Sequence, residues 1–127
     1  MPSIAGLASL KLMAWVDRRV ETRRDAVDLQ TIIGWYGTAD LFDELYENHV
    51  ELLEAYDFDP DQACAHRLGR DIADVLRAET PRLLGVLDDD TLGRLVADMP
   101  ATLVDQPAML RALRSGLRGE AGPRPGA

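Results

Sequence analysis

Two opposite charges stand on the apolar faces of the first two predicted helices, and this feature constrains the fold most. When residues 4–19 are placed on a helix at about 100° per residue, Lys11 falls in the middle of an apolar arc. That arc consists of Ile4, Leu7, Ala8, Ala14 and Trp15. Residues 25–36 form a second apolar arc, and Asp25 lies inside it at the N-terminal end. Because a buried charge without a partner is costly, the two helices are predicted to form a hairpin in which Lys11 faces Asp25.

This pairing has two interpretations. In the simpler one, an ion pair joins the two helices; such a pair adds little net stability but is costly to break. In the other, Lys11 binds a phosphate or another anionic substrate in a cleft, and Asp25 orients it or holds a metal ion. Carboxylates in the first turn of a helix also complement its dipole. This last explanation accounts well for Asp28 and less well for Asp25, which is predicted to face inward.

The charged segment carries two short motifs. They read K-L-x-A-W-x-D-R at residues 11–18 and R-R-D-A-x-D-L at residues 23–29. Together they resemble the second half of the AbiEii/AbiGii-type nucleotidyltransferases, the toxin-side family of some bacterial toxin–antitoxin and phage-exclusion systems. A weaker similarity follows at residues 68–73.

The resemblance implies specific roles for five residues. Lys11 and Asp25 would belong to the active site as catalytic residues, and Arg18, Arg24 and Asp28 would contact the substrate. The complete family enzyme would transfer a nucleotide from an NTP to an acceptor, often RNA, with the help of Mg²⁺. The resemblance also implies that an antitoxin is a possible partner.

The chain departs from the family at its N-terminal side. The nucleotide-binding half of the family precedes the matching region and carries a Gly-Ser turn and an Asp-x-Asp pair that holds Mg²⁺, whereas only ten residues precede Lys11 here. We therefore expect the C-terminal helical part of such a protein, which binds no cofactor alone and is inactive unless another chain supplies the missing half. The alternative is a non-catalytic helical interaction module, such as a homodimer.

Helical spacing recurs along the rest of the chain, without strand-like alternation. The predicted helices span about 4–20, 24–36, 40–55, 60–78, 80–87, 91–98 and 106–117. The sequence therefore predicts an all-α protein, a compact bundle of six to seven helices with no sheet. One helical domain over 1–115 is expected, followed by a disordered tail over 116–127 that is rich in Gly, Pro and Arg.

Several Asp-x-Asp pairs occur outside the first two helices. Asp57, Asp59 and Asp61 precede or begin a predicted helix in which Asp59 is the N-cap and Pro60 the first residue. Residues 88–90 also stand at a helix start. We interpret these carboxylates as caps rather than as metal ligands.

Charge and cysteine content exclude several classes of protein. The net charge is −8, and residues 36–64 contain nine acidic and no basic residues, which argues against a general nucleic-acid binder. Only the arginines in 18–24 and 111–124 form basic groups, and neither resembles a DNA recognition helix. Cys64 is the only cysteine and is expected to be a buried apolar side chain. With no disulfide, signal peptide or apolar run of membrane-spanning length, we expect a cytoplasmic protein that does not enter the membrane.

Overall fold

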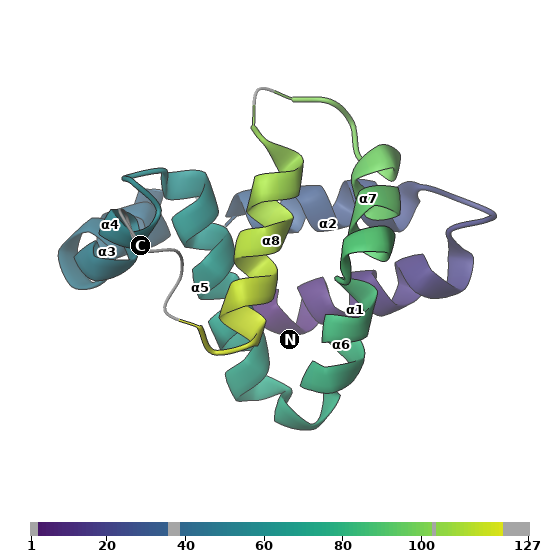
Figure 1. Ribbon diagram of the computed structural model, residues 1–127, viewed down its shortest axis with the longest axis horizontal. Coiled ribbons are helices and arrows are strands. Elements are labelled where there is room, and N and C mark those ends of the chain that lie inside the picture. Colours follow the sequence, from purple (N-terminus) through teal and green to yellow (C-terminus); the bar gives the residue numbers. More distant parts are fainter. Residues whose placement is uncertain (1–2, 36–38, 103, 121–127) are drawn as a thin grey trace.

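The computed structural model describes residues 3–35, 39–102 and 104–120, and this part of the chain is all-α, as predicted (Figure 1). It contains eight α-helices, one 3₁₀ turn and no strand. The helices are α1 (Ile4–Arg18), α2 (Arg24–Trp35), α3 (Ala39–Asn48), α4 (Val50–Ala55), α5 (Pro60–Val75), α6 (Thr80–Val86), α7 (Asp89–Asp98) and α8 (Gln106–Leu117). The 3₁₀ turn η1 (Arg77–Glu79) lies between α5 and α6.

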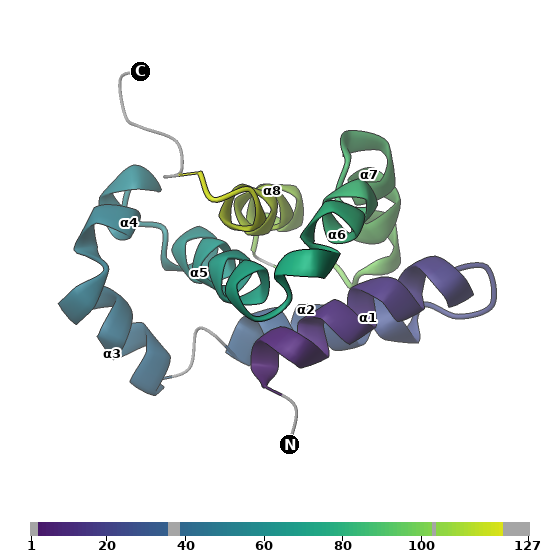
Figure 2. The same ribbon diagram turned by 90° about the horizontal axis from the view of Figure 1, so that it is seen from below.

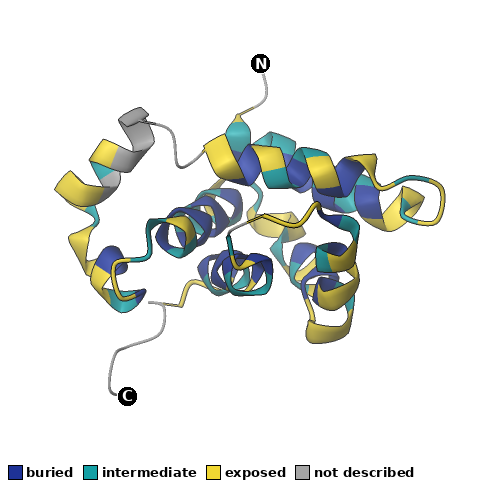
Figure 3. Ribbon diagram, turned by 90° about the horizontal axis from the view of Figure 1, so that it is seen from above, coloured by how far each residue is buried: buried dark blue, intermediate teal, exposed yellow. Residues whose placement is uncertain are grey.

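Helices α5 and α8 form the centre of the molecule, and they touch through two glycines. A Cβ atom on Gly69 would collide with the carbonyl oxygen of Leu113, and one on Gly116 would collide with that of His66. The sequence therefore places glycine where the two backbones meet. Both helices are buried along much of their length (Figure 3).

The other helices pack around this central pair. Helices α1 and α2 form a hairpin in which they lie side by side, and α1 also contacts α5 and α6 (Figure 2). Helices α3 and α4 lie at one end of the molecule, and the turn between α1 and α2 lies at the other; α6 and α7 lie on the side of α8 that faces this turn (Figure 1). The hairpin that carries the predicted charges is therefore attached directly to the core.

The helix starts follow the predicted capping chemistry. The Asp59 carboxylate accepts hydrogen bonds from the backbone N–H groups of Asp61 and Gln62, and the Gln62 side-chain amide donates to the same carboxylate. At the start of α7, Asp88 accepts from the backbone N–H of Thr91. These contacts assign Asp59 and Asp88 to helix capping.

Three predicted boundaries are wrong. The helix expected over 40–55 is divided at His49, whose backbone leaves the helical conformation and whose carbonyl begins α4 by accepting from Leu52 and Leu53. The helix expected to reach residue 78 stops at Val75 and is followed by η1. The expected tail begins too early, because Gly116 and Leu117 are buried in α8. Residues 121–127 lie outside the described part of the chain.

The buried face of α1 also differs from the predicted arc. Its buried residues are Ala5, Ala8, Ser9, Leu12 and Trp15, whereas Ile4, Leu7 and Ala14 are only half-buried. The difference arises because α5 and α6 cover α1 as well as α2 does. Lys11 therefore lies at the edge of the buried face instead of at its middle.

Candidate functional site

The hairpin of α1 and α2 brings four charged side chains together. The Lys11 ammonium lies 2.8 Å from an oxygen of Asp28 and 3.7 Å from an oxygen of Asp25. The Arg18 guanidinium donates to both oxygens of Asp25, over 3.1 Å from Nε and 2.7 Å from the terminal nitrogen. The predicted meeting of Lys11 and Asp25 is therefore present, but Arg18 is the closer partner of Asp25.

Burial differs strongly between the members of this cluster. Asp25 has no exposed surface, whereas 28% of the Lys11 side chain and 52% of the Arg18 side chain are exposed. A buried carboxylate requires compensation, and two cations with a bidentate guanidinium contact provide it. With two cations and two carboxylates, the cluster is electrically neutral.

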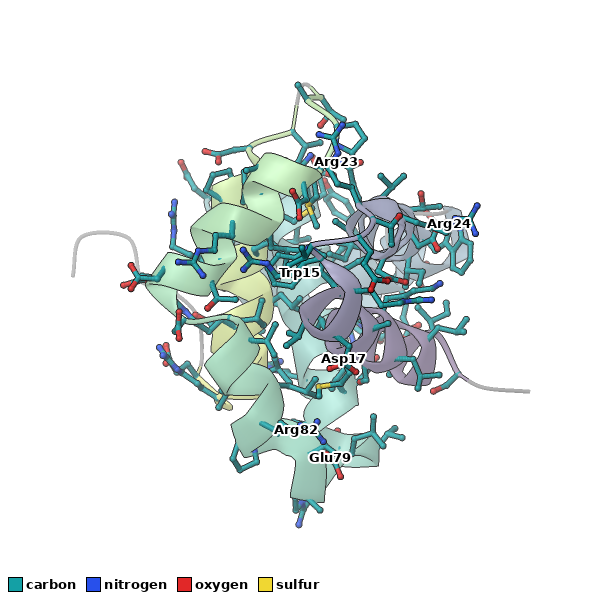
Figure 4. All side chains as sticks on the ribbon, turned by 90° about the vertical axis from the view of Figure 1, so that its right-hand side faces the viewer. Trp15, Asp17, Arg23, Arg24, Glu79 and Arg82 are labelled. Atoms are coloured by element: carbon teal, nitrogen blue, oxygen red, sulfur yellow. The ribbon has the colours of Figure 1, made fainter. Side chains whose placement is uncertain are left out.

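Arg24, the fifth residue that the resemblance singles out, does not join the cluster. It is exposed at the start of α2, and it lies at the outer edge of the molecule in Figure 4. Its backbone N–H donates to the Thr22 hydroxyl, but its side chain forms no ion pair within the described residues. The structure therefore brings Lys11, Arg18, Asp25 and Asp28 together and leaves Arg24 apart.

Trp15 holds α1 in place behind the cluster. Its ring is fully buried, and its indole N–H donates to the Asp98 carboxylate of α7 over 2.9 Å. The Arg19 guanidinium lies 5.4 Å from the ring centroid, a cation–π distance. In Figure 4, Trp15 points from α1 toward the side of α7. This contact fixes the rotation of α1, and hence the side on which Lys11 and Arg18 emerge.

The cluster does not fit a Mg²⁺ ion. Both oxygens of Asp25 are already bound by Arg18, and Asp28 is bound by Lys11. In the described part of the chain, no group of three or more His, Cys, Asp or Glu side chains could hold a metal ion. Any Mg²⁺ used in nucleotide transfer would therefore need carboxylates from outside these residues.

A second polar centre, which the sequence pattern did not reveal, lies between α4, α5 and α8. The Tyr56 hydroxyl and His66 Nδ1 are 2.7 Å apart, and His66 has no exposed surface. Burial, and secondarily the positive charge of Arg70, lowers the pKa of His66 to about 4, and burial raises the pKa of Tyr56 to about 12. His66 Nε2 has no hydrogen-bond partner within the described residues. The only available signal was the apolar spacing around His66, which predicts burial but no partner.

Cys64 and His49 lie away from the cluster, and Cys64 is buried as expected. Cys64 is buried in α5, and burial raises the pKa of its thiol to about 11. His49 lies between α3 and α4, with Nε2 3.9 Å from a Glu44 oxygen. Glu44 also binds Arg67 over 2.9 Å, so part of the acidic surface of α3 pairs with α5.

No family model, characterised protein or solved structure matches the chain. Among the described residues, none of the helices combines the length and the apolar character that crossing a bilayer demands.

Proposed function

We propose that the chain is the C-terminal helical part of an AbiEii/AbiGii-type nucleotidyltransferase, with Lys11 as its phosphate-binding residue. The supporting observation is the cluster itself. Four of the five residues that the resemblance singles out, Lys11, Arg18, Asp25 and Asp28, come together although seventeen positions separate the first from the last.

The geometry gives the four residues different roles in this proposal. Lys11 is partly exposed and bound by the partly exposed Asp28, so its ammonium can exchange that carboxylate for a phosphate oxygen. Asp25 is buried and bound by Arg18, so it is a positioning residue that holds the Arg18 guanidinium in place. Arg18 is exposed enough to reach a substrate while it holds Asp25.

The chain alone would not complete the reaction. Mg²⁺ would neutralise charge on the triphosphate, but the two carboxylates of the cluster are bound by Arg18 and Lys11, and no group of three or more possible metal ligands lies among the described residues. We therefore propose that a nucleotide-binding half with a Gly-Ser turn and an Asp-x-Asp pair acts together with this chain. The acceptor, RNA in the implied family activity, would meet the assembled site.

The chain offers a selective test because Lys11 is its only lysine. Reductive methylation with ¹³C-formaldehyde would label Lys11 and the N-terminal amine alone, and dimethylation keeps the positive charge. Addition of ATP with Mg²⁺ is expected to shift the Lys11 signal and to leave the N-terminal signal unchanged. Equal shifts of both signals, or no shift at saturating ATP, would contradict phosphate binding at Lys11.

Transfer activity is tested with the product of the reading frame directly upstream, if it encodes the two missing motifs. Labelled nucleotide should reach RNA only when both chains are present. Lys11→Ala should reduce transfer by about a hundredfold or more, as loss of a charge-stabilising donor does in other active sites. Arg82→Gln, at an exposed position of α6, is the matched control and should retain activity. Transfer that survives Lys11→Ala would refute the assignment.

A second candidate function, self-association through α1, rests on a different observation. Leu10 is 62% exposed and borders an apolar cavity of about 380 Å³. Gly6, Ser9, Leu10 and Met13 line it from α1 at the spacing of a coiled-coil hole, and Leu76, Glu79 and Leu83 complete it. The patch thus presents a leucine and a hole that accepts a leucine, the self-complementarity that a two-fold dimer requires.

We propose a second copy of the chain as the occupant of this cavity. Light scattering after size exclusion should give the mass of a dimer, and Leu10→Asp should give that of a monomer. Val20→Asp is the control, because Val20 is 93% exposed but does not line the cavity. A wild-type monomer at high concentration would exclude this function.

A further inference from the structure

A polar cavity lies on the opposite side of the core from the Lys11 cluster, along α8. Its volume is about 360 Å³. Helix α8 supplies one continuous face to it, at the spacing of successive turns, through Ala108, Arg111, Ala112, Arg114, Ser115 and Arg118. Tyr56 and Gln62 close it from α4 and α5, and Glu120 stands at its end. No residue of α1 or α2 lines it, so this cavity is independent of the site proposed above.

Hydrogen-bond donors converge on this cavity. Arg111 is exposed and forms no ion pair within the described residues, and the Arg118 guanidinium is about half exposed. The Ser115 hydroxyl lies between them on the helix. The Tyr56 hydroxyl contacts His66 Nδ1 and is also within hydrogen-bond reach of the Ser115 side chain.

The chain's own carboxylate occupies part of this site weakly. An oxygen of Glu120 lies 3.5 Å from the Ser115 hydroxyl, and the other lies 3.6 Å from the Arg118 guanidinium. A well-formed charge-assisted contact is about 2.7–2.9 Å long. Both contacts of Glu120 are longer than this, so its carboxylate leaves the donors of Ser115 and Arg118 incompletely satisfied.

The charge on the lining favours an anion with more than one negative charge. Three arginines face one glutamate there, in a chain whose net charge is −8. Arg114 also lines the cavity, but its guanidinium is already bound by Asp89 over 2.7 Å and by the Leu87 carbonyl, which leaves Arg111 and Arg118 available. Two planar guanidinium groups with the Ser115 hydroxyl between them can donate to several oxygens of a phosphate, which carries more negative charge than a single carboxylate.

We propose that this cavity binds a phosphate monoester group, with Arg111, Ser115 and Arg118 as its ligands, and that Glu120 competes with that group. The binding replaces the carboxylate of Glu120 at Ser115 and Arg118 and adds the unpaired Arg111.

The test is a titration of the ¹⁵N-labelled chain, with NMR readout, using inorganic phosphate and, in a second arm, glycerol 3-phosphate. Sodium chloride at matched ionic strength serves as the reference. Amide shifts are expected at residues 111–119 in at least one arm. A response to both ligands assigns the site to phosphate in general, and a response to glycerol 3-phosphate alone assigns it to organic monoesters.

Variants distinguish a site formed by these particular residues from non-specific attraction of anions to exposed arginines. Arg111→Gln and Arg118→Gln should each weaken binding about two- to fivefold, the range that exposed charge contacts support. Glu120→Gln should strengthen binding, because it removes the competing charge. Arg82→Gln should have no effect. The proposal is overturned if chloride produces the same shifts, if Arg82→Gln weakens binding equally, or if Glu120→Gln leaves the affinity unchanged.

Discussion

The guanidinium of Arg18 binds both carboxylate oxygens of Asp25, although Asp25 is completely buried and Arg18 is half exposed. This relationship makes the two residues unequal in a mutational test. Loss of Arg18 leaves a buried carboxylate with Lys11 as its remaining cation at 3.7 Å. Loss of Asp25 leaves cations that can turn toward water.

We therefore expect Arg18→Gln to lower the free energy of unfolding by about 3 kcal/mol, the usual result of breaking a buried pair from one side. The double variant Arg18→Gln with Asp25→Asn should lose less than the sum of the two single variants, because it contains no buried charge. Urea unfolding of the four proteins in this cycle measures the coupling. Arg24→Gln is the control and should change stability by less than about 0.5 kcal/mol. Strictly additive losses would contradict the pairing.

Alanine at Gly116 should destabilise the protein by about 1–3 kcal/mol or more, because its Cβ would collide with the His66 carbonyl across the helix crossing. Gly69→Ala should behave alike, because the Leu113 carbonyl opposes it. Gly93 lies on the exposed side of α7, and a Cβ atom added there would meet no atom within 4 Å. Gly93→Ala should therefore stabilise the protein by about 0.5–1 kcal/mol. Thermal unfolding separates the two classes.

Stability should fall as the pH is lowered from about 6.5 toward about 4, and His66 is the reason. Burial, with a smaller contribution from Arg70, lowers its pKa to about 4 in the folded chain, whereas the ordinary value is 6.5. The unfolded chain therefore takes up a proton in this range that the folded chain does not, so the loss builds from pH 6.5 downward and is complete near pH 4. It amounts to about 3 kcal/mol at most.

The pH dependence is measured by urea unfolding between pH 7.5 and pH 4. His66→Gln should flatten the curve over this window. His49→Gln is the comparison variant, because it alters the other histidine of the chain at a partly exposed position. If His49→Gln flattens the pH dependence of the unfolding free energy and His66→Gln does not, His66 is accessible to protons in the folded state.

Cys64 should not react with Ellman's reagent in the folded protein. Its side chain is buried, and burial raises the pKa of the thiol to about 11, so hardly any thiolate exists at neutral pH. The same chain in guanidinium chloride should release one equivalent of thiolate product rapidly. Fast modification of the folded chain would place Cys64 in an open part of α5.

The fold was largely predictable because its determinants are local. Apolar spacing located the helices, and Asp59, Pro60 and Asp88 marked starts that the structure confirms. The break at His49 was not predictable, since its side chain makes no capping hydrogen bond that a pattern would reveal. The observed buried face of α1 is rotated relative to the predicted one. Contacts with α5 and α6 decide which of its residues are buried, and the spacing within one helix does not reveal those contacts.

The residues of the candidate site were predictable from the sequence, but which cation binds which carboxylate was not. The burial of Asp25 follows from its place among apolar residues of α2. That Arg18 binds it more closely than Lys11 does depends on the crossing of α1 and α2, which spacing does not give. Contacts between distant segments, such as Trp15 with Asp98 or Tyr56 with His66, left no trace in local patterns.

The single lysine of the chain also lies within a helix, in the ionic cluster of the hairpin. An endoproteinase that cuts only after lysine therefore has one cleavage position in the whole polypeptide, and a helical backbone cannot enter the protease active site. Each cut must follow local opening of α1. The rate of appearance of two fragments thus reports directly on how often the first helix detaches from the rest of the protein.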